Sequence, residues 1–148
     1  METGLMEEFL QFYRRTMGLV PAETGQYSPL VLAYVGDAVY EVMVRTKVVN
    51  AGNVPVNKLH KKSSRLVCAN AQARMIKLLE PRLTDEENAV FKRGRNAKSY
   101  TCAKNASIAD YRLATGFEAL VGWLFLSEQF ERLAVLVSEG MQALEAEG

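Results

Sequence analysis

The sequence predicts an all-α fold, a helical bundle forming a single domain over residues 1–148. Apolar residues recur at helical spacing in almost every segment, which is the pattern of helices that pack on a shared core. No segment sustains the apolar–polar alternation of a half-buried strand, and no Asn-Gly or Asp-Gly pair marks a hairpin. Hydrophobic residues make up 49% of the chain, so we expect one core of useful size.

Capping residues define the helices of the first third of the chain. Residues 6–13 form a short amphipathic stretch that ends near Gly18. Ser28 followed by Pro29 is typical of a helix N-terminus, because serine caps the first turn and proline fits its first position. That helix is expected to run to about Asn50. Its first three turns are apolar on all sides, so we expect it to be central and buried.

The helical pattern continues through the middle of the chain. Residues 55–65 and 69–79 are predicted to be helical, either as one helix or as two, and to end at Pro81. Residues 84–87 read Thr-Asp-Glu-Glu, which is a capping box for a helix that stops at Gly94.

A loop and two more helices complete the prediction. Residues 94–106 are rich in Gly, Asn, Ser and Lys and are expected to form a loop. Ser107 is expected to cap a second apolar helix that ends near Leu126, and Ser127 to cap a final amphipathic helix. The apolar positions of the last helix are Leu133, Leu136, Val137 and Met141.

Charge is strongly segregated along the chain, although the net charge is only +1. Residues 42–79 contain eight Lys or Arg and no acid, and residues 88–109 carry +5, also without an acid. Residues 1–41, 80–87 and 110–148 carry −4, −3 and −5. If the fold gathers the two acid-free blocks on one face, that face is suited to a polyanion such as nucleic acid.

Nothing in the sequence indicates export or a membrane. The two cysteines, Cys68 and Cys102, lack a CxxC or metal-binding spacing and are interpreted as reduced residues of a cytoplasmic protein. The N-terminus has no basic region followed by an apolar run, and no stretch approaches the roughly 20 uncharged residues of a spanning helix. We therefore expect a cytoplasmic protein without membrane association.

Two carboxylates stand alone in the most apolar stretches of the chain. Asp37 is the only charge in residues 28–40, and Glu118 is the only charge in residues 113–126. A carboxylate buried without a partner is costly, so such a group is usually neutral, paired or bound to a cation. Two interpretations stay open: a metal-binding or acid–base pair, or carboxylates at a core boundary with distant basic partners.

Two further acids are weaker candidates for the same site. Glu41 follows Asp37 by one helical turn but is better explained by an i,i+4 pair with Arg45. Asp110 precedes Glu118 by two turns but is better explained as an acid at a helix N-terminus.

Three glycines inside the two apolar helices predict a close crossing. Gly36, Gly116 and Gly122 each cost about 1 kcal/mol relative to alanine. Close helix–helix approach is the expected compensation. Because Gly36 and Gly116 lie near the lone carboxylates, we expect the two helices to cross there.

Two basic groups are candidates for phosphate contacts. The first is a stripe at i, i+3, i+4 and i+7 on the predicted helix over residues 55–65, where like charges repel unless a polyanion neutralises them. An ordinary solvated face is the alternative, but such a face normally mixes both signs. Leu59 and Leu66 are expected to anchor the helix to the core. The second group surrounds a Gly-centred turn in residues 92–99, which can present N–H and guanidinium groups to phosphate. The candidates are Lys58, Lys61, Lys62 and Arg65 in the stripe, and Arg93, Arg95, Asn96, Lys98 and Lys104 in and after the turn.

Other chemistry-bearing residues give weaker signals. His60, the single histidine, is expected at the surface among basic neighbours, and no nucleophile motif accompanies it. Trp123 and Phe125 lie in the second apolar helix and are expected in the core rather than as base-stacking platforms.

Four segments together resemble the catalytic domain of the ribonuclease III family. Residues 32–39, Leu-Ala-Tyr-Val-Gly-Asp-Ala-Val, resemble its signature helix, and residues 117–122, Phe-Glu-Ala-Leu-Val-Gly, resemble its second catalytic helix. Residues 59–65 and 92–99 look closer still to the compact bacterial branch, Mini-ribonuclease III. Each motif is short, but all four occur in order, and the resemblance covers roughly residues 28–145.

The resemblance implies an all-α catalytic domain that acts as a homodimer on double-stranded RNA, recognised mainly by shape and phosphates. It implies hydrolysis that depends on Mg²⁺, with Mn²⁺ as a substitute, and that leaves 5′-phosphate and 3′-hydroxyl ends. Asp37 and Glu118 carry over as catalytic, metal-binding residues. The compact branch matures large-subunit (23S) ribosomal RNA precursors in bacteria, so that RNA is the implied substrate. Whether a large-subunit ribosomal protein must first shape the RNA stays open.

The chain departs from the full-length family in two ways. It stops at Gly148, which leaves no room for a separate double-stranded RNA-binding domain, so we expect affinity to come from the basic groups. Ala33 stands where the family usually has Glu, and Thr115 where it usually has Asp. We therefore expect Asp37 and Glu118 to supply most of the protein's own metal ligands, with water or RNA phosphates completing the shell around an open number of ions.

Two other functions fit parts of the pattern. A non-catalytic helical RNA-binding protein with an eroded site would keep the basic groups. An all-α nucleoside triphosphate pyrophosphohydrolase needs clustered ExxE-type carboxylates on one helix, whereas Glu86 and Glu87 are better explained by the capping box.

Overall fold

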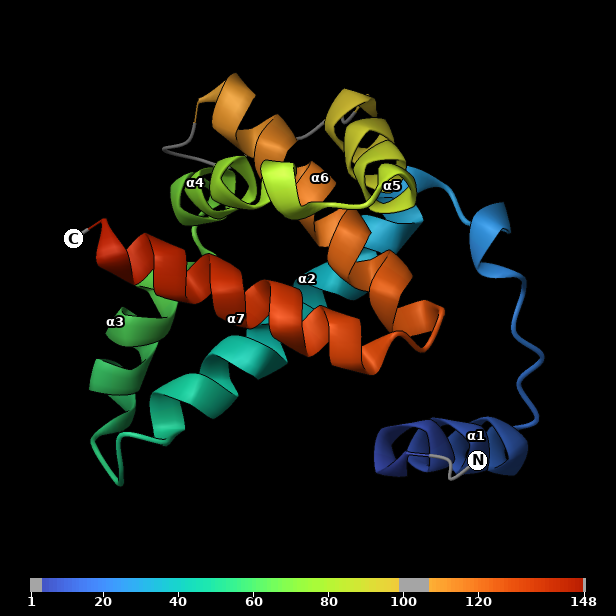
Figure 1. Ribbon diagram of the computed structural model, residues 1–148. Coiled ribbons are helices and arrows are strands. Elements are labelled where there is room, and N and C mark those ends of the chain that lie inside the picture. The colour runs from blue at the N-terminus through green and yellow to red at the C-terminus, as the bar shows by residue number, and fades with distance from the viewer. Residues whose placement is uncertain (1–3, 99–106, 148) are drawn as a thin grey trace.

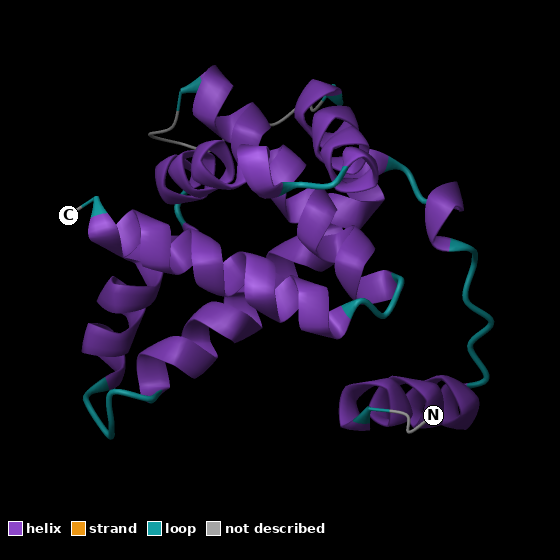
Figure 2. Cartoon of the chain, viewed as in Figure 1, coloured by secondary structure: helices purple, strands orange, loops and turns teal. Residues whose placement is uncertain are grey.

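The computed structural model describes residues 4–98 and 107–147, and this part of the chain is built from helices (Figures 1 and 2). The first helix lies apart from the others in Figure 1, at the end of a long connection to the second. The described residues contain no strand, which confirms the all-α prediction. The elements are α1 (Leu5–Met17), a 3₁₀ turn (Thr24–Gln26), α2 (Pro29–Val49), α3 (Val56–Val67), α4 (Ala69–Leu79), a second 3₁₀ turn (Glu80–Arg82), α5 (Asp85–Asn96), α6 (Ile108–Leu126) and α7 (Phe130–Ala146).

The core is organised around α6. This helix packs along α2 and also against α4 and α5, while α7 crosses next to α4 and α6 (Figure 1). Burial on α6 is almost continuous from Ala114 to Leu124, with Glu118 as the partly exposed exception. The expectation of a buried second apolar helix is therefore confirmed. Trp123 is 8% exposed and Phe125 packs against the core, as expected.

The first apolar helix is only half buried, which corrects the expectation of a fully buried element. One side of α2 packs on the rest of the chain, whereas Tyr34 and Val42 on the other side are 81% and 64% exposed. That open side borders an apolar groove whose opposite wall includes Phe9 of α1. Hydropathy along the sequence cannot separate a face covered by the chain itself from one left open to another surface. The buried stripe of α2 is Leu32, Ala33, Gly36, Tyr40, Val44 and Val48.

Helix N-termini follow the capping pattern in most places. Ser28 accepts a hydrogen bond from the N–H of Val31 at 3.3 Å, and Ser107 accepts one from the N–H of Asp110 at 3.0 Å. The capping box of α5 is formed in both directions, because the Thr84 and Glu87 side chains each accept a hydrogen bond from the other residue's N–H, at 3.1 and 2.9 Å.

Ser127 does not cap the final helix, so that prediction is wrong. The last helix begins only at Phe130, and the Ser127 hydroxyl instead donates a hydrogen bond to the carbonyl oxygen of Trp123 at 2.6 Å. The same carbonyl also accepts the N–H of Ser127 at 2.9 Å. A serine can donate its hydroxyl to the carbonyl four residues earlier in a helix, and sequence alone does not separate this role from a following N-cap.

The first helix ends where predicted, the fifth extends beyond its predicted end, and one predicted ambiguity is settled. The first helix reaches Met17 and ends at Gly18, whose φ of 68° is left-handed. The middle region forms two helices, because Cys68 is extended with φ −65° and ψ 155°. The fifth helix continues past Gly94 to Asn96, so the predicted Gly-centred turn is wrong over this stretch. The rest of the predicted loop at residues 99–106, with Cys102 and Lys104, lies outside the described residues. No helix of the described part is long and apolar enough to cross a membrane.

Candidate active site

Two glycines bring the backbones of α2 and α6 into contact. A Cβ atom built on Gly36 would overlap the carbonyl oxygen of Glu118, and one built on Gly122 would overlap the carbonyl oxygen of Leu32. The predicted close crossing is therefore confirmed at Gly36. Gly116 has a different role from the one expected, because its Cβ would lie 2.7 Å from the ring of Phe91 on α5 rather than against α2.

The crossing places the two lone carboxylates side by side. Asp37 follows the glycine that touches the Glu118 backbone, and it is exposed, whereas Glu118 is half-buried behind it. Burial raises the pKa of Glu118 to about 8, and the charge of Asp37 and a hydrogen bond between the two carboxyl groups add to the rise. The pair is thus a real cluster, but water reaches one member, which corrects the picture of two dry carboxylates.

Two buried polar residues that the sequence analysis missed support this pair. The Gln72 side chain on α4 donates hydrogen bonds to the carbonyl oxygen of Val67 at 2.8 Å and to Glu118 Oε2 at 3.5 Å. The Tyr40 hydroxyl on α2 donates to the carbonyl oxygen of Leu66 at 2.7 Å, and burial raises the pKa of Tyr40. Both side chains therefore connect the site to the C-terminal end of α3. A sequence signal for Gln72 existed, because it continues the apolar stripe of Met75, Ile76 and Leu79.

The two weaker acidic candidates have the alternative roles expected of them. Glu41 forms an ion pair with Arg45 at 3.0 Å. Asp110 lies in the first turn of α6 and accepts a hydrogen bond from Asn70 at 3.2 Å.

The two positions at which the resemblance leads one to expect carboxylates, Ala33 and Thr115, are buried and uncharged. Ala33 is 7% exposed, and Thr115 is 7% exposed with its hydroxyl donating to the carbonyl oxygen of Tyr111 at 2.9 Å. Within residues 4–98 and 107–147, no group of three or more His, Cys, Asp or Glu side chains is arranged to hold a metal ion. The pair of Asp37 and Glu118 nevertheless fits a divalent cation, because two adjacent carboxylates repel each other unless a proton or a cation neutralises them.

The basic stripe on α3 is exposed, as the sequence analysis expected. Across the described residues, no carboxylate lies within ion-pair distance of its four cations, whereas Arg45, Lys47 and Arg74 of the same acid-free block do have acidic partners. Leu59 and Leu66 pack against the core, which confirms their anchoring role. The stripe consists of Lys58, Lys61, Lys62 and Arg65.

The second basic group lies at the end of α5, beside α6. A Cβ on Gly94 would lie 2.7 Å from Cβ of Ala119, the residue after Glu118, so this glycine serves close helix packing. Arg95 lies over the Phe91 ring at 5.7 Å from its centroid, and its Nε donates to Asn96 at 3.1 Å. Both basic groups thus border the helices that carry the pair. Arg93 and Lys98 are exposed, and Lys104 is outside the described residues.

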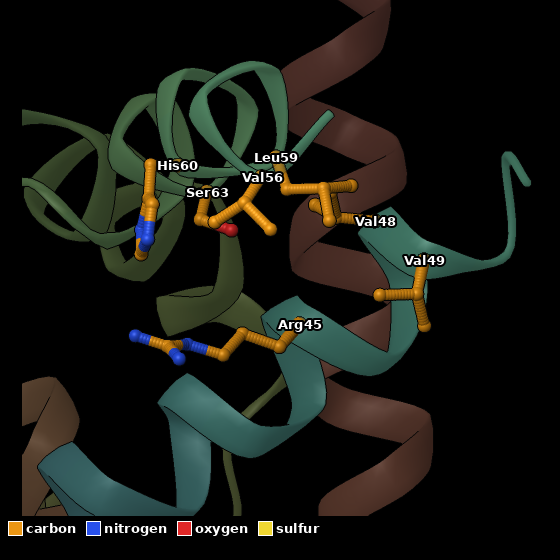
Figure 3. Close-up of a pocket in the computed structure, with 7 residues that line it drawn as sticks. All are labelled: Arg45, Val48, Val49, Val56, Leu59, His60 and Ser63. Atoms are coloured by element: carbon orange, nitrogen blue, oxygen red, sulfur yellow. The ribbon is translucent and has the colours of Figure 1, made fainter. Parts of the chain in front are cut away.

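A small hollow separates the end of α2 from the beginning of α3 (Figure 3). In Figure 3 the polar ends of Arg45 and His60 lie on the same side of the hollow, away from Val49. His60 is exposed, as expected. Neither carboxylate of the pair lines the hollow, so the hollow is separate from the candidate active site. Its walls are Arg45, Val48, Val49, Val56, Leu59, His60 and Ser63.

Comparison with known proteins assigns the fold and site to one class of nuclease. The ribonuclease III domain family matches residues 30–129, which run from the first turn of α2 to just past the end of α6, so the chain belongs to the ribonuclease III family. Members of this family are endoribonucleases that act on double-stranded RNA as dimers and generally use divalent metal ions. A crystal structure of a Fusobacterium nucleatum protein has the same fold, with a TM-score of 0.72 and 26% identity over 80% of this chain and 94% of that one.

Curated relatives narrow the assignment to a branch of the family. Mini-ribonuclease 3 of Clostridium tetani is 55% identical over 73% of this chain and 72% of its own length. Mini-ribonuclease 3 of Brevibacillus brevis is 51% identical over 81% and 90%, and that of a Thermoanaerobacter species is 48% identical over 80% and 83%. The chain is therefore an endoribonuclease of the Mini-ribonuclease 3 group.

Proposed function

We propose that this endoribonuclease depends on Mg²⁺, with Mn²⁺ as a substitute, and uses Asp37 and Glu118 as its catalytic, metal-binding pair. The observation that carries the proposal is the crossing of α2 and α6, which joins two carboxylates whose repulsion a cation relieves. Carboxylate oxygens are the protein ligands that Mg²⁺ prefers. Because Ala33 and Thr115 add no charge, water or RNA phosphates complete the metal shell.

The two carboxylates have different tasks in this proposal. A divalent cation at the pair supplies Lewis acidity toward a phosphate and lowers the pKa of a water molecule. Asp37 is exposed and would face the RNA, whereas the half-buried Glu118 would hold the cation from the protein side. Because burial and the charge of Asp37 raise the pKa of Glu118, cation binding at the pair would release the Glu118 proton to solvent. The products carry 5′-phosphate and 3′-hydroxyl ends, so the P–O3′ bond is the one that breaks.

RNA binding is assigned to the two basic groups that border the pair. The α3 stripe lacks acidic partners in the described chain, and its C-terminal end is tied to the site by Tyr40 and Gln72. The α5 group lies against α6 through Gly94. Phosphates on both sides of a cleavage point would meet these cations. The proposed RNA-binding residues are Lys58, Lys61, Lys62, Arg65, Arg93, Arg95, Asn96, Lys98 and Lys104.

The proposed assembly is a homodimer that matures 23S ribosomal RNA precursors in the cytoplasm. Dimerisation of family members supports the assembly, and the apolar groove along Tyr34 and Val42 offers a face for a second copy. The proposed substrate rests on the Mini-ribonuclease 3 resemblance.

Cleavage of a long RNA hairpin tests the catalytic assignment. Wild-type protein with Mg²⁺ is expected to make defined cuts, and Asp37→Asn to bind the hairpin without cutting it. Glu41→Gln is the matched control, because Glu41 is a carboxylate on the same helix that pairs with Arg45 and is expected to be dispensable. Normal cutting by Asp37→Asn would refute the assignment.

Three further outcomes separate the alternatives. RNA binding without any cleavage by the wild type would indicate a non-catalytic binding protein. Pyrophosphate release from nucleotides with the RNA intact would indicate a pyrophosphohydrolase. If a 23S precursor is cut only after a large-subunit ribosomal protein is added, that protein is a partner. Analytical ultracentrifugation of the protein alone measures whether it is a dimer.

A further inference from the structure

The Gln72 carboxamide is buried against the catalytic pair. Its side chain is 3% exposed, and its Nε2 donates to the Val67 carbonyl and to Glu118 Oε2. Its Oε1 is buried and has no hydrogen-bond partner within the described residues. Both N–H groups of the amide are therefore used, and its acceptor is left unsatisfied.

This arrangement is unfavourable for packing alone. A buried polar group without a partner costs about 1–3 kcal/mol. Methionine or leucine has a similar volume and would continue the apolar stripe of α4 without that cost. Apolar packing alone therefore does not account for an amide at this position, whereas its hydrogen bonds to the Val67 carbonyl and to Glu118 do.

We propose that Gln72 is a positioning residue for metal binding: anchored on the Val67 carbonyl, its amide holds the Glu118 carboxylate in the orientation that pairs it with Asp37. This inference rests on the proposed function, because it takes the pair as the cation site. A glutamate fixed before the cation arrives loses less side-chain freedom on binding it. Ala33 and Thr115 cannot share this task, since they place no carboxylate or amide next to the pair.

The hydrogen bond from Gln72 to the Val67 carbonyl also connects the proposed cation site to the helix that is proposed to bind RNA. Val67 is the last residue of α3, the helix that carries the basic stripe. A shift of α3 on RNA would therefore reach Glu118 through one side chain.

The test compares Gln72→Met with wild type and with Asn88→Leu. Asn88 is the matched control, because its Oδ1 is also buried without a partner but the residue lies on α5, outside the contacts of the pair. The first readout is Mn²⁺ binding to the RNA-free protein, measured by electron paramagnetic resonance. The others are the Mg²⁺ concentration for half-maximal cleavage, RNA binding in EDTA, and the midpoint of urea unfolding.

Gln72→Met is expected to weaken Mn²⁺ binding about 10- to 100-fold, as loss of other outer-shell partners does. The half-maximal Mg²⁺ concentration rises in parallel, while RNA binding in EDTA is unchanged. The unfolding midpoint stays close to that of the wild type, because loss of the Val67 hydrogen bond offsets removal of the unpaired Oε1. Asn88→Leu keeps wild-type Mn²⁺ binding. Wild-type Mn²⁺ affinity in Gln72→Met would overturn the proposal, and so would a loss of stability that accompanies the loss of affinity. If the wild type itself neither binds Mn²⁺ nor cleaves RNA, the proposed function fails instead.

Discussion

The raised pKa of Glu118 predicts how the stability of the metal-free protein depends on pH. The folded state holds this proton more tightly than the unfolded chain does, because burial and the charge of Asp37 oppose ionisation. A tightly held proton favours the folded state at low pH. The stability it contributes is therefore complete below the unfolded pKa and is lost as the pH rises toward the folded value of about 8.

The size of the loss follows from the shift. A pKa of about 8 against a model value of 4.5, at about 1.4 kcal/mol per pKa unit, corresponds to roughly 3–5 kcal/mol of unfolding free energy. Glu118→Gln cannot ionise, so it is expected to remove this pH dependence and to be more stable than wild type by a similar amount at pH 8.5. If Mg²⁺ binds the pair as proposed, it replaces the proton there and is expected to stabilise the wild type most at high pH.

Urea unfolding in EDTA between pH 5 and 9, at a fixed protein concentration, measures the effect. The fluorescence of Trp123 is a suitable probe, because it is the single tryptophan, is 8% exposed and lies on the same helix as Glu118. Glu41→Gln is the control, and its curve is expected to follow the wild type. If Glu118→Gln also follows the wild-type curve, the carboxyl group does not carry the pH dependence and the assigned electrostatics of the pair are wrong.

Three other changes test the crossing, the basic stripe and the capping box. Gly36→Ala should lower the free energy of unfolding in urea by about 1–3 kcal/mol, because the added Cβ overlaps the Glu118 carbonyl. The control is Gly25→Ala, whose added Cβ has no atom within 4 Å. Equal effects of the two substitutions would contradict the close crossing. Neutralising Lys61 and Lys62 with glutamine should lower the slope of RNA affinity against salt by up to about 2, and Lys77→Gln should not; an unchanged slope excludes the stripe from the interface. Glu87→Gln should lower the unfolding free energy by about 1–3 kcal/mol at neutral pH, because Arg132 loses a partner at 2.8 Å. The Arg132 hydrogen bond holds the pKa of Glu87 below its usual range, so this deficit should shrink as the pH falls through the folded pKa, and a deficit that persists at low pH would argue against the ion pair.

Local chemistry explains which elements the sequence predicts well. Ser28, Ser107 and the Thr84–Glu87 box act within one helical turn, so their residue types are sufficient to locate helix starts. The prediction that the helix ends at Gly94 was wrong because this glycine packs closely against α6, which lies far along the chain. The open face of α2 was missed for a similar reason, since an apolar residue looks the same whether or not something covers it.

The residues of the candidate site also differ in whether local sequence reveals them. Asp37 and Glu118 stand out because a charge inside an apolar run is visible without a structure. Gln72 is uncharged and lies in a mixed segment, so only the packing of α4 on α6 reveals that its amide meets a carboxylate. Its position on the same helical face as Met75 and Leu79 indicates that Gln72 is buried. That position does not indicate which residue its amide contacts.

The backbone contact at Gly36 also limits how the site can change. The backbones of α2 and α6 are already in contact, so neither helix can move closer to compensate for a shorter side chain at position 37 or 118. The gap between the carboxylates is consequently fixed by side-chain length, and replacing Glu118 by aspartate would widen it by one methylene that no helix shift recovers. If the pair binds a cation as proposed, a different ion would be accommodated by exchanging these side chains rather than by moving the helices, because the two backbones are already in contact.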